Sequence, residues 1–195
     1  MLDRFAIGLF ALSLAACSQE AAQPQELPSE PLPTPAEMPG PDEGVYPSMM
    51  QSSISIVGGD GTEIGTGNLI GGPNGLLIRV EIAPGGLTPG WHGLHLHAVG
   101  DCSDVGTFKL SGGHVGKIEG GHGLLNPKGP EGGDIPNIWA AADGSAGYEA
   151  FTTLTKMSDL QDEDGSALLI HEGEDDAMTQ PIGGAGARVA CGVIK

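Results

Sequence analysis

Histidine is the residue type that points most directly to chemistry in this sequence. All six histidines lie between positions 92 and 171, and three of them fall in the run WHGLHLH at 91–97. In a β-strand alternate side chains share a face, so His95 and His97 would point to one side and His92 to the other. Two imidazoles at this spacing on a rigid strand are a natural pair of metal ligands, although a histidine-rich surface strand would show the same spacing.

The sequence that follows adds more side chains of the kinds that bind transition metals. These are His114, His122, Glu131, Asp134 and His171. Imidazole nitrogen suits copper and zinc, and a carboxylate oxygen can complete a zinc site. The number of donors therefore predicts a metal site rather than a solvated histidine-rich surface.

The elements that must position these residues are short β-strands. Runs rich in β-branched and apolar residues recur between turns rich in glycine, proline, asparagine and aspartate. The predicted strands are 54–57, 64–70, 76–82, 91–98, 137–142, 148–154, 167–171 and 188–194. This rhythm predicts an all-β sandwich or barrel. The connection over 99–135 is too long for a structureless loop in a compact domain, so something besides packing must order it.

Composition excludes several classes of protein. The chain has 25 acidic and 8 basic residues, for a net charge of −17, with 34 glycines and 15 prolines among 195 residues. So many glycines oppose a helical bundle, and they show no collagen period. An acidic chain without a cluster of basic residues is also a poor partner for nucleic acid.

The N-terminal residues predict export and anchoring. Residues 1–16 have the size and apolar character of a secretory signal and are too short to span a bilayer. The sequence LAAC at 14–17 resembles a bacterial lipobox, which would make Cys17 the lipidated first residue; an ordinary signal with a chance cysteine is the alternative. The residue after Cys17 is Ser18, and not the aspartate that would suggest retention in the inner membrane. We therefore expect a protein of the periplasm or cell envelope, lipid-anchored at the outer membrane.

A tether and one domain complete the organisation. Residues 18–48 hold eight prolines, six acids and no basic residue, a composition that favours extended chain. We predict that 17–48 comprises the lipidated cysteine and a disordered tether, with a pro-segment as the alternative. The domain runs over 49–195.

The motifs of this domain resemble copper/zinc superoxide dismutases, specifically the bacterial periplasmic type. The resemblance rests on GLHLH at 93–97, GGH ending at His114, GDIPN at 133–137, and ARVACGVI at 187–194. It covers essentially all of 49–195. It implies a Greek-key β-barrel of about eight strands with long metal-binding and electrostatic loops, and disproportionation of superoxide to oxygen and hydrogen peroxide.

The resemblance also implies two metal ions and their ligands. Copper would be bound by His95, His97, His114 and His171, and zinc by His114, His122 and Asp134. His114 would bridge the two metals and supply a proton during turnover. Copper provides the redox chemistry, because zinc does not change oxidation state.

Glu131 departs from the family pattern, which has a histidine at this position. A carboxylate can ligate zinc, so Glu131 could complete the zinc site with two imidazoles and a second carboxylate. In the other interpretation, Glu131 points to solvent and zinc is weakly bound or absent. That second interpretation would make the protein a copper-only dismutase.

The resemblance assigns roles to several further residues. Arg188 would guard the copper and attract the anionic substrate, whereas an ordinary surface arginine is the alternative. Asp175 would join a copper histidine to a zinc histidine, and the neighbouring acids would be a solvated turn. Cys102 and Cys191 would form a disulfide that fixes the 99–135 loop to the last strand; two buried thiols are the alternative. His92, opposite the copper pair, is expected to be packed and hydrogen-bonded beneath the site.

Two alternatives to a copper/zinc enzyme remain at this point. One is the copper-only dismutase, and the other is a non-enzymatic copper-binding lipoprotein. A storage protein would need neither His114 as a bridge nor Arg188 as a guard, which favours an enzyme. The sequence allows either a monomer or a homodimer.

Overall fold

The computed structural model describes residues 50–195. The signal peptide predicted at 1–16, the lipidated Cys17, the rest of the segment predicted over 17–48 and residue 49 all lie outside the described residues. Within 50–195, no helix has the length and apolar character needed to cross a membrane.

Residues 50–195 contain nine β-strands and two single helical turns, joined by turns and loops, and the predicted all-β class is confirmed. The strands are β1 (Met50–Gly58), β2 (Glu63–Gly72), β3 (Gly75–Ile82), β4 (Gly90–His92), β5 (Leu94–His97), β6 (Ile138–Ala140), β7 (Ala146–Thr152), β8 (Ser166–His171) and β9 (Arg188–Ile194). The helical turns are η1 (Lys109–Ser111) and α1 (Met157–Leu160).

The strand predicted over 91–98 is in fact two strands, so that prediction was wrong. The break lies at Gly93, whose N–H donates to the carbonyl of Gly173 at 2.8 Å and whose carbonyl accepts from the N–H of His171 at 2.9 Å. A Cβ at this position would lie 2.9 Å from the Cβ of Ala185. The backbone of Gly93 is therefore bonded to the end of β8 and the loop after it, and β4 and β5 pair with different strands.

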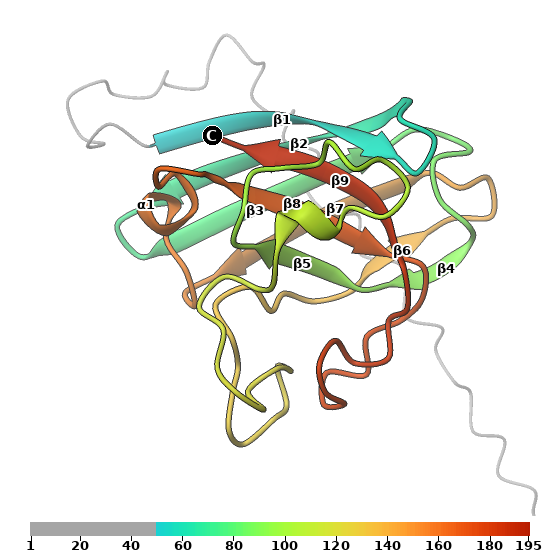
Figure 1. Cartoon of the computed structure of the whole chain (residues 1–195). Coiled ribbons are helices and arrows are strands. Elements are labelled where there is room, and N and C mark those ends of the chain that lie inside the picture. The colour runs from blue at the N-terminus through green and yellow to red at the C-terminus, as the bar shows by residue number, and fades with distance from the viewer. Residues whose placement is uncertain (1–49) are drawn as a thin grey trace, which may run out of the picture. The chain divides into compact units, whose positions relative to one another are not determined.

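The strands form a curled antiparallel sheet (Figure 1). Seven strands follow the order β5-β8-β9-β1-β2-β3-β7, and β4 pairs with β6 in a two-stranded ribbon. This ribbon is continuous in the chain with both edges of the large sheet, because β4 leads into β5 and β6 leads into β7. The long connection from β7 returns β8 to the side of β5, as expected for a Greek-key arrangement.

Both faces of β8 are covered, and this anchors the loop that carries the site. All six residues of β8 are buried. One face packs in the main core, while Ala167 and Leu169 on the other face pack with Phe108 and Cys191. Phe108 is fully buried although its φ of 49° is left-handed, which costs about 1–2 kcal/mol. Burial of its ring contributes about 1.5–3 kcal/mol, enough to offset that cost.

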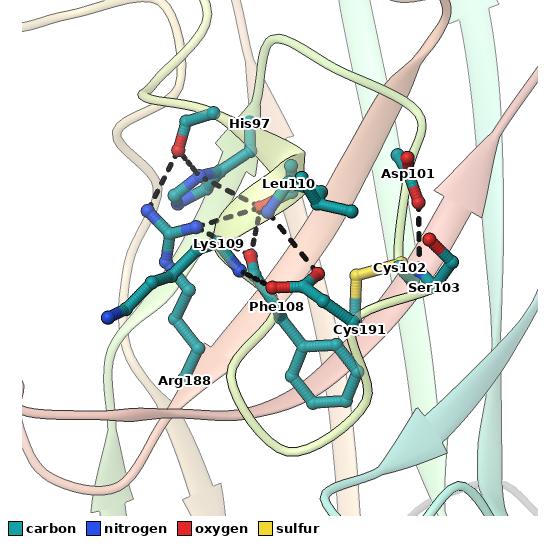
Figure 2. The surroundings of a disulfide bond; sticks show 12 residues. His97, Asp101, Cys102, Ser103, Phe108, Lys109, Leu110, Arg188 and Cys191 are labelled. Carbon is teal, nitrogen blue, oxygen red and sulfur yellow. Dashed lines mark hydrogen bonds between the residues drawn. A yellow bond between two sulfur atoms is a disulfide. The ribbon is translucent and has the colours of Figure 1, made fainter.

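A disulfide joins the same loop to β9. The sulfur atoms of Cys102 and Cys191 are bonded, with Cα atoms 5.9 Å apart, and the predicted pairing is confirmed. Figure 2 shows this bond beside Phe108 and Arg188. The long connection after β5 is thus ordered by a covalent bond and a buried aromatic ring, close to the start of β9.

Candidate metal centre

The outer edge of β5 brings residues from the long connection to the strand histidines. Isolated β-bridges pair His95 with Asp134 and His97 with His114. Between them, the N–H of Leu96 donates to the carbonyl of Gly133 at 2.9 Å. Backbone pairing therefore places four of the predicted site residues side by side.

Three histidines, His95, His97 and His171, form a compact group whose ring nitrogens could bind one metal ion. His97 Nδ1 lies 2.9 Å from the carbonyl oxygen of Gly112, and His171 Nδ1 lies 3.1 Å from that of Gly186. His95 Nε2 instead lies 2.6 Å from the carboxylate oxygen Oδ2 of Asp175. The other nitrogen of each ring is buried and makes no hydrogen bond with any described residue. One potential ligand atom from each of the three lies within 4.8 Å of those of the other two.

These contacts fix the tautomer of each ring. A nitrogen that faces a carbonyl or carboxylate oxygen must carry the proton, so the opposite nitrogen presents its lone pair. The bare atoms are His95 Nδ1, His97 Nε2 and His171 Nε2. Such a set of neutral imidazole lone pairs fits a transition metal and has no other partner in this part of the chain.

A second group contains His95, His114, His122 and Asp134, again with donor atoms within 4.8 Å of one another. Asp134 Oδ1 lies 2.9 Å from His122 Nδ1 and 3.1 Å from His114 Nδ1. Neither ring nitrogen of His114 forms a hydrogen bond with a described residue. The His114 ring centre is 4.4 Å from that of His95, 5.1 Å from that of His97 and 5.2 Å from that of His122, so His114 lies beside members of both groups.

Glu131 is buried and faces His114 rather than solvent. Its side chain is 4% exposed, and its Oε2 lies 2.9 Å from His114 Nδ1. Its Oε1 accepts a hydrogen bond from the N–H of Ile118 at 3.0 Å. Glu131 is not a member of the compact second group and meets it through His114.

Asp175 contacts a histidine of each group. Its Oδ2 lies 2.6 Å from His95 Nε2 and 3.2 Å from His122 Nε2. His92 lies on β4 and is also buried, with Nδ1 at 2.7 Å from the carbonyl oxygen of His171 and Nε2 at 2.7 Å from that of Thr88. His92 therefore reaches the site through the backbone of His171, and Asp175 reaches it through two side chains.

The electrostatics of the two groups differ. Burial, aided by the charge of Arg188, lowers the pKa of His97 to about 2. Burial likewise lowers the pKa of His171 to about 4, so both rings are neutral at pH 7. Burial opposes charge at His122 as well, but hydrogen bonds to Asp134 and Asp175 raise the pKa of His122 to about 10.

Arg188 lies beside the group formed by His95, His97 and His171, which we call the nitrogen-only group because all its donors are imidazole nitrogens. Its guanidinium group donates to the carbonyl oxygen of Phe108 at 2.6 Å (Figure 2) and to that of Gly112 at 2.8 Å. Arg188 and His171 line the same cavity of about 300 Å³, at the surface between the loop that follows β5 and the loop that follows β8. A cavity of this size is ample for a small anion, which would meet both a guanidinium group and an imidazole.

Three residues near the site carry contacts that sequence reasoning missed. Lys109 lines the cavity with Arg188. Asn137 exchanges two hydrogen bonds with the backbone of Asp175, at 2.8 and 3.1 Å. Gln180 does the same with the backbone of His122, at 2.8 and 3.2 Å. Asn137 follows Asp134 closely in sequence, but no sequence signal indicates which backbone groups these amides meet.

Comparison with known proteins agrees with this geometry. The family model described as copper/zinc superoxide dismutase matches residues 66–194. A superoxide dismutase [Cu-Zn] of Caulobacter vibrioides is 47% identical over 152 residues, which cover 74% of this chain and 86% of that protein. Superoxide dismutase [Cu-Zn] 1 of Aquifex aeolicus is 40% identical over 152 residues, covering 75% and 88%.

Solved structures show the same fold. A Cu/Zn superoxide dismutase from Brucella abortus has a TM-score of 0.61 and 30% identity, covering 75% of this chain and all of that one. A superoxide dismutase-like protein from Bacillus subtilis has a TM-score of 0.64 and 34% identity, covering 73% and 97%. The strand order, the two histidine groups and the matched sequence together show that this chain belongs to the copper/zinc superoxide dismutase family.

Proposed function

We propose that this chain disproportionates superoxide: two superoxide ions and two protons give one oxygen and one hydrogen peroxide. The observation that carries the proposal is the set of buried imidazole nitrogens with no hydrogen-bond partner among the described residues. Such atoms are costly unless a ligand satisfies them. Copper held by His95, His97, His114 and His171 would supply one-electron chemistry, taking an electron from one superoxide and giving one to the next.

The anion-binding role falls to Arg188. Two carbonyl oxygens hold its guanidinium group at the wall of the cavity that His171 also lines. A guanidinium group fixed in this way attracts a small anion and donates to it without further ordering. Arg188 thus sets the position of superoxide beside the nitrogen-only group.

The proton-handling role falls to His114. Its Nε2 is buried beside the nitrogen-only group, while its Nδ1 faces Asp134 and Glu131. Because Nδ1 is directed at these two carboxylates and the zinc ion they would hold, Nε2 is the atom that would take up and release a proton when it is not bound to copper. Asp175 supports this arrangement, because it contacts the rings of His95 and His122, both of which lie beside His114.

Zinc would be held by His114, His122, Asp134 and Glu131. Two imidazoles and two carboxylates are an acceptable zinc ligand set. Burial of Glu131 against His114 favours this arrangement over a copper-only dismutase, in which Glu131 would point to solvent.

A superoxide-disproportionation assay at measured copper content tests the function. We expect copper-loaded protein to be active, and His114→Ala to retain copper while losing about 10²–10⁴-fold in rate, the usual contribution of a positioned proton donor. Equal rates for the two proteins at equal copper content would refute the catalytic role and favour the non-enzymatic copper-binding alternative.

The cellular location belongs to the same proposal. Bonded Cys102 and Cys191 support an oxidising compartment, because cytosolic thiols are kept reduced. We place the protein in the periplasm or cell envelope, lipid-anchored through Cys17 and attached to the outer membrane. Replacement of Cys17 by serine should then abolish incorporation of labelled palmitate and release the protein to the soluble fraction. Retention of label in that variant would contradict the anchor.

A further inference from the structure

Glu131 and Asp134 are held in the same way. Asp134 Oδ2 accepts hydrogen bonds from the N–H groups of Gly123 and Glu131, both at 2.8 Å, and its Oδ1 lies 3.1 Å from His114 Nδ1. Glu131 Oε1 accepts from the N–H of Ile118 at 3.0 Å, and its Oε2 lies 2.9 Å from the same nitrogen of His114. Each carboxylate therefore has one oxygen fixed by the backbone and the other directed at His114 Nδ1, and Asp134 Oδ1 also lies 2.9 Å from His122 Nδ1.

Two carboxylates at this position create a demand for positive charge. Both side chains are almost fully buried, and within residues 50–195 no lysine or arginine forms an ion pair with either of them. Their ion-pair partners there are His114 and His122, and imidazoles must be neutral when they bind a metal, so they supply no positive charge in that state. Buried charge without compensation is strongly unfavourable. A divalent cation balances two carboxylates, whereas a monovalent cation leaves one net negative charge in the interior.

The nitrogen-only group makes no such demand. His95, His97 and His171 contribute uncharged imidazole nitrogens, with no carboxylate among the three donors. Imidazole is a suitable ligand for copper, whereas carboxylates suit harder ions and match a soft monovalent ion such as Cu(I) poorly. The two adjacent groups therefore differ in both charge and chemical hardness.

We infer that Glu131 is a metal-sorting residue: it excludes Cu(I) from the second group and reserves that group for a divalent ion. The inference rests on the proposed function, since it assumes that copper belongs to the nitrogen-only group. A histidine at position 131 would remove the second carboxylate and with it the charge that distinguishes a divalent from a monovalent ion.

The test is an anaerobic Cu(I) titration of the folded, disulfide-bonded protein against a chromogenic Cu(I) chelator. The proteins are the wild type, Glu131→Gln, Glu131→His and Glu119→Gln. Glutamine keeps the shape of residue 131 and the acceptor for Ile118, and Glu119 is an exposed acid lining the same surface pocket as Glu131. In a parallel titration, Co(II) reports on the second group through its visible absorption.

We expect the wild type and Glu119→Gln to bind one Cu(I) per chain and to keep Co(II) in its presence. Both Glu131 variants should bind a second Cu(I), and Glu131→Gln should lose at least about tenfold in Co(II) affinity. A second Cu(I) in the wild type, held as tightly as in Glu131→His, would overturn the inference. Absence of any Cu(I) from the wild type would instead overturn the copper site, and an unchanged Co(II) affinity in Glu131→Gln would still refute the role of Glu131.

Discussion

The disulfide between Cys102 and Cys191 couples the stability of the barrel to the position of Arg188. The bond closes a loop between residues 89 positions apart in the sequence. Within that loop lie the carbonyl oxygens of Phe108 and Gly112, which accept hydrogen bonds from the Arg188 guanidinium group. Replacing Cys102 by serine removes the bond while Cys191 keeps its buried, apolar position beside Phe108.

The expected loss of stability follows from the length of the closed loop. Loop-closure entropy for about 90 residues amounts to about 4–5 kcal/mol in the unfolding free energy at 25 °C. That is a large part of the total for a domain of this size, which is typically about 5–15 kcal/mol. We therefore expect the Cys102→Ser protein to unfold at a much lower urea concentration than the wild type.

Urea unfolding followed by tryptophan fluorescence measures this loss, and the matched control is the reductant. Reduction should lower the stability of the wild type to that of Cys102→Ser and leave the variant unchanged. In the same proteins kcat/KM should fall, because the loop carbonyls no longer fix Arg188, while the copper content stays near that of the wild type. A stability change below about 1 kcal/mol, or an unchanged kcat/KM, would refute the coupling.

Three further predictions concern charge. Arg188→Ala should lower kcat/KM by about 10- to 100-fold, because a hydrogen bond to a charged group usually contributes this much. Copper content is measured in the same samples, and an unchanged kcat/KM would contradict the role of Arg188. Lys109→Gln should lower kcat/KM at low ionic strength and have little effect above about 0.15 M salt, whereas Lys156→Gln, away from the cavity, should have no effect at either. In the metal-free protein, burial lowers the folded-state pKa of His97 to about 2 and of His171 to about 4, below the value of 6.5 expected after unfolding. Both rings then gain a proton on unfolding, so the unfolding free energy should fall by up to about 1.4 kcal/mol per pH unit per histidine as pH drops from about 6.5 to 4. His122 has a raised pKa, so it is charged in both the folded and the unfolded state over this range and adds nothing. A urea midpoint that does not change over this range would contradict the lowered pKa values of His97 and His171.

Much of the fold could be predicted from local pattern. Alternation of apolar residues and the glycine-rich turns locate the strands other than β4 and β5 to within about four residues, because most of these strands bury one face. The break at Gly93 could not be predicted, since it arises from hydrogen bonds to the segment around residues 171–173, far along the chain. A sequence pattern reports what a segment prefers locally, and it carries no information about which distant backbone crosses it.

The residue types that could bind a metal were likewise predictable from the sequence, but which of them lie together was not. Spacing places His95 and His97 on one face of β5, yet only pairing along the edge of that strand brings His114 and Asp134 beside them. Gln180 has no recognisable motif, and its contacts with the backbone of His122 depend on two loops meeting. Residues that act through backbone groups are the hardest to find from sequence, because any polar side chain of suitable length can make such contacts.

Burial decides how the negative charge of the chain affects an anionic substrate. The net charge of −17 belongs to the whole sequence, and at physiological ionic strength exposed acids farther than about 8 Å from the cavity are largely screened. The buried carboxylates near the site are Glu131, Asp134 and Asp175, and each of them lies against a histidine. The wall of the cavity includes Arg188, Lys109 and His171 and no acidic residue. The field that superoxide meets is therefore set by one guanidinium group and one lysine, and an acidic protein can bind an anion without contradiction.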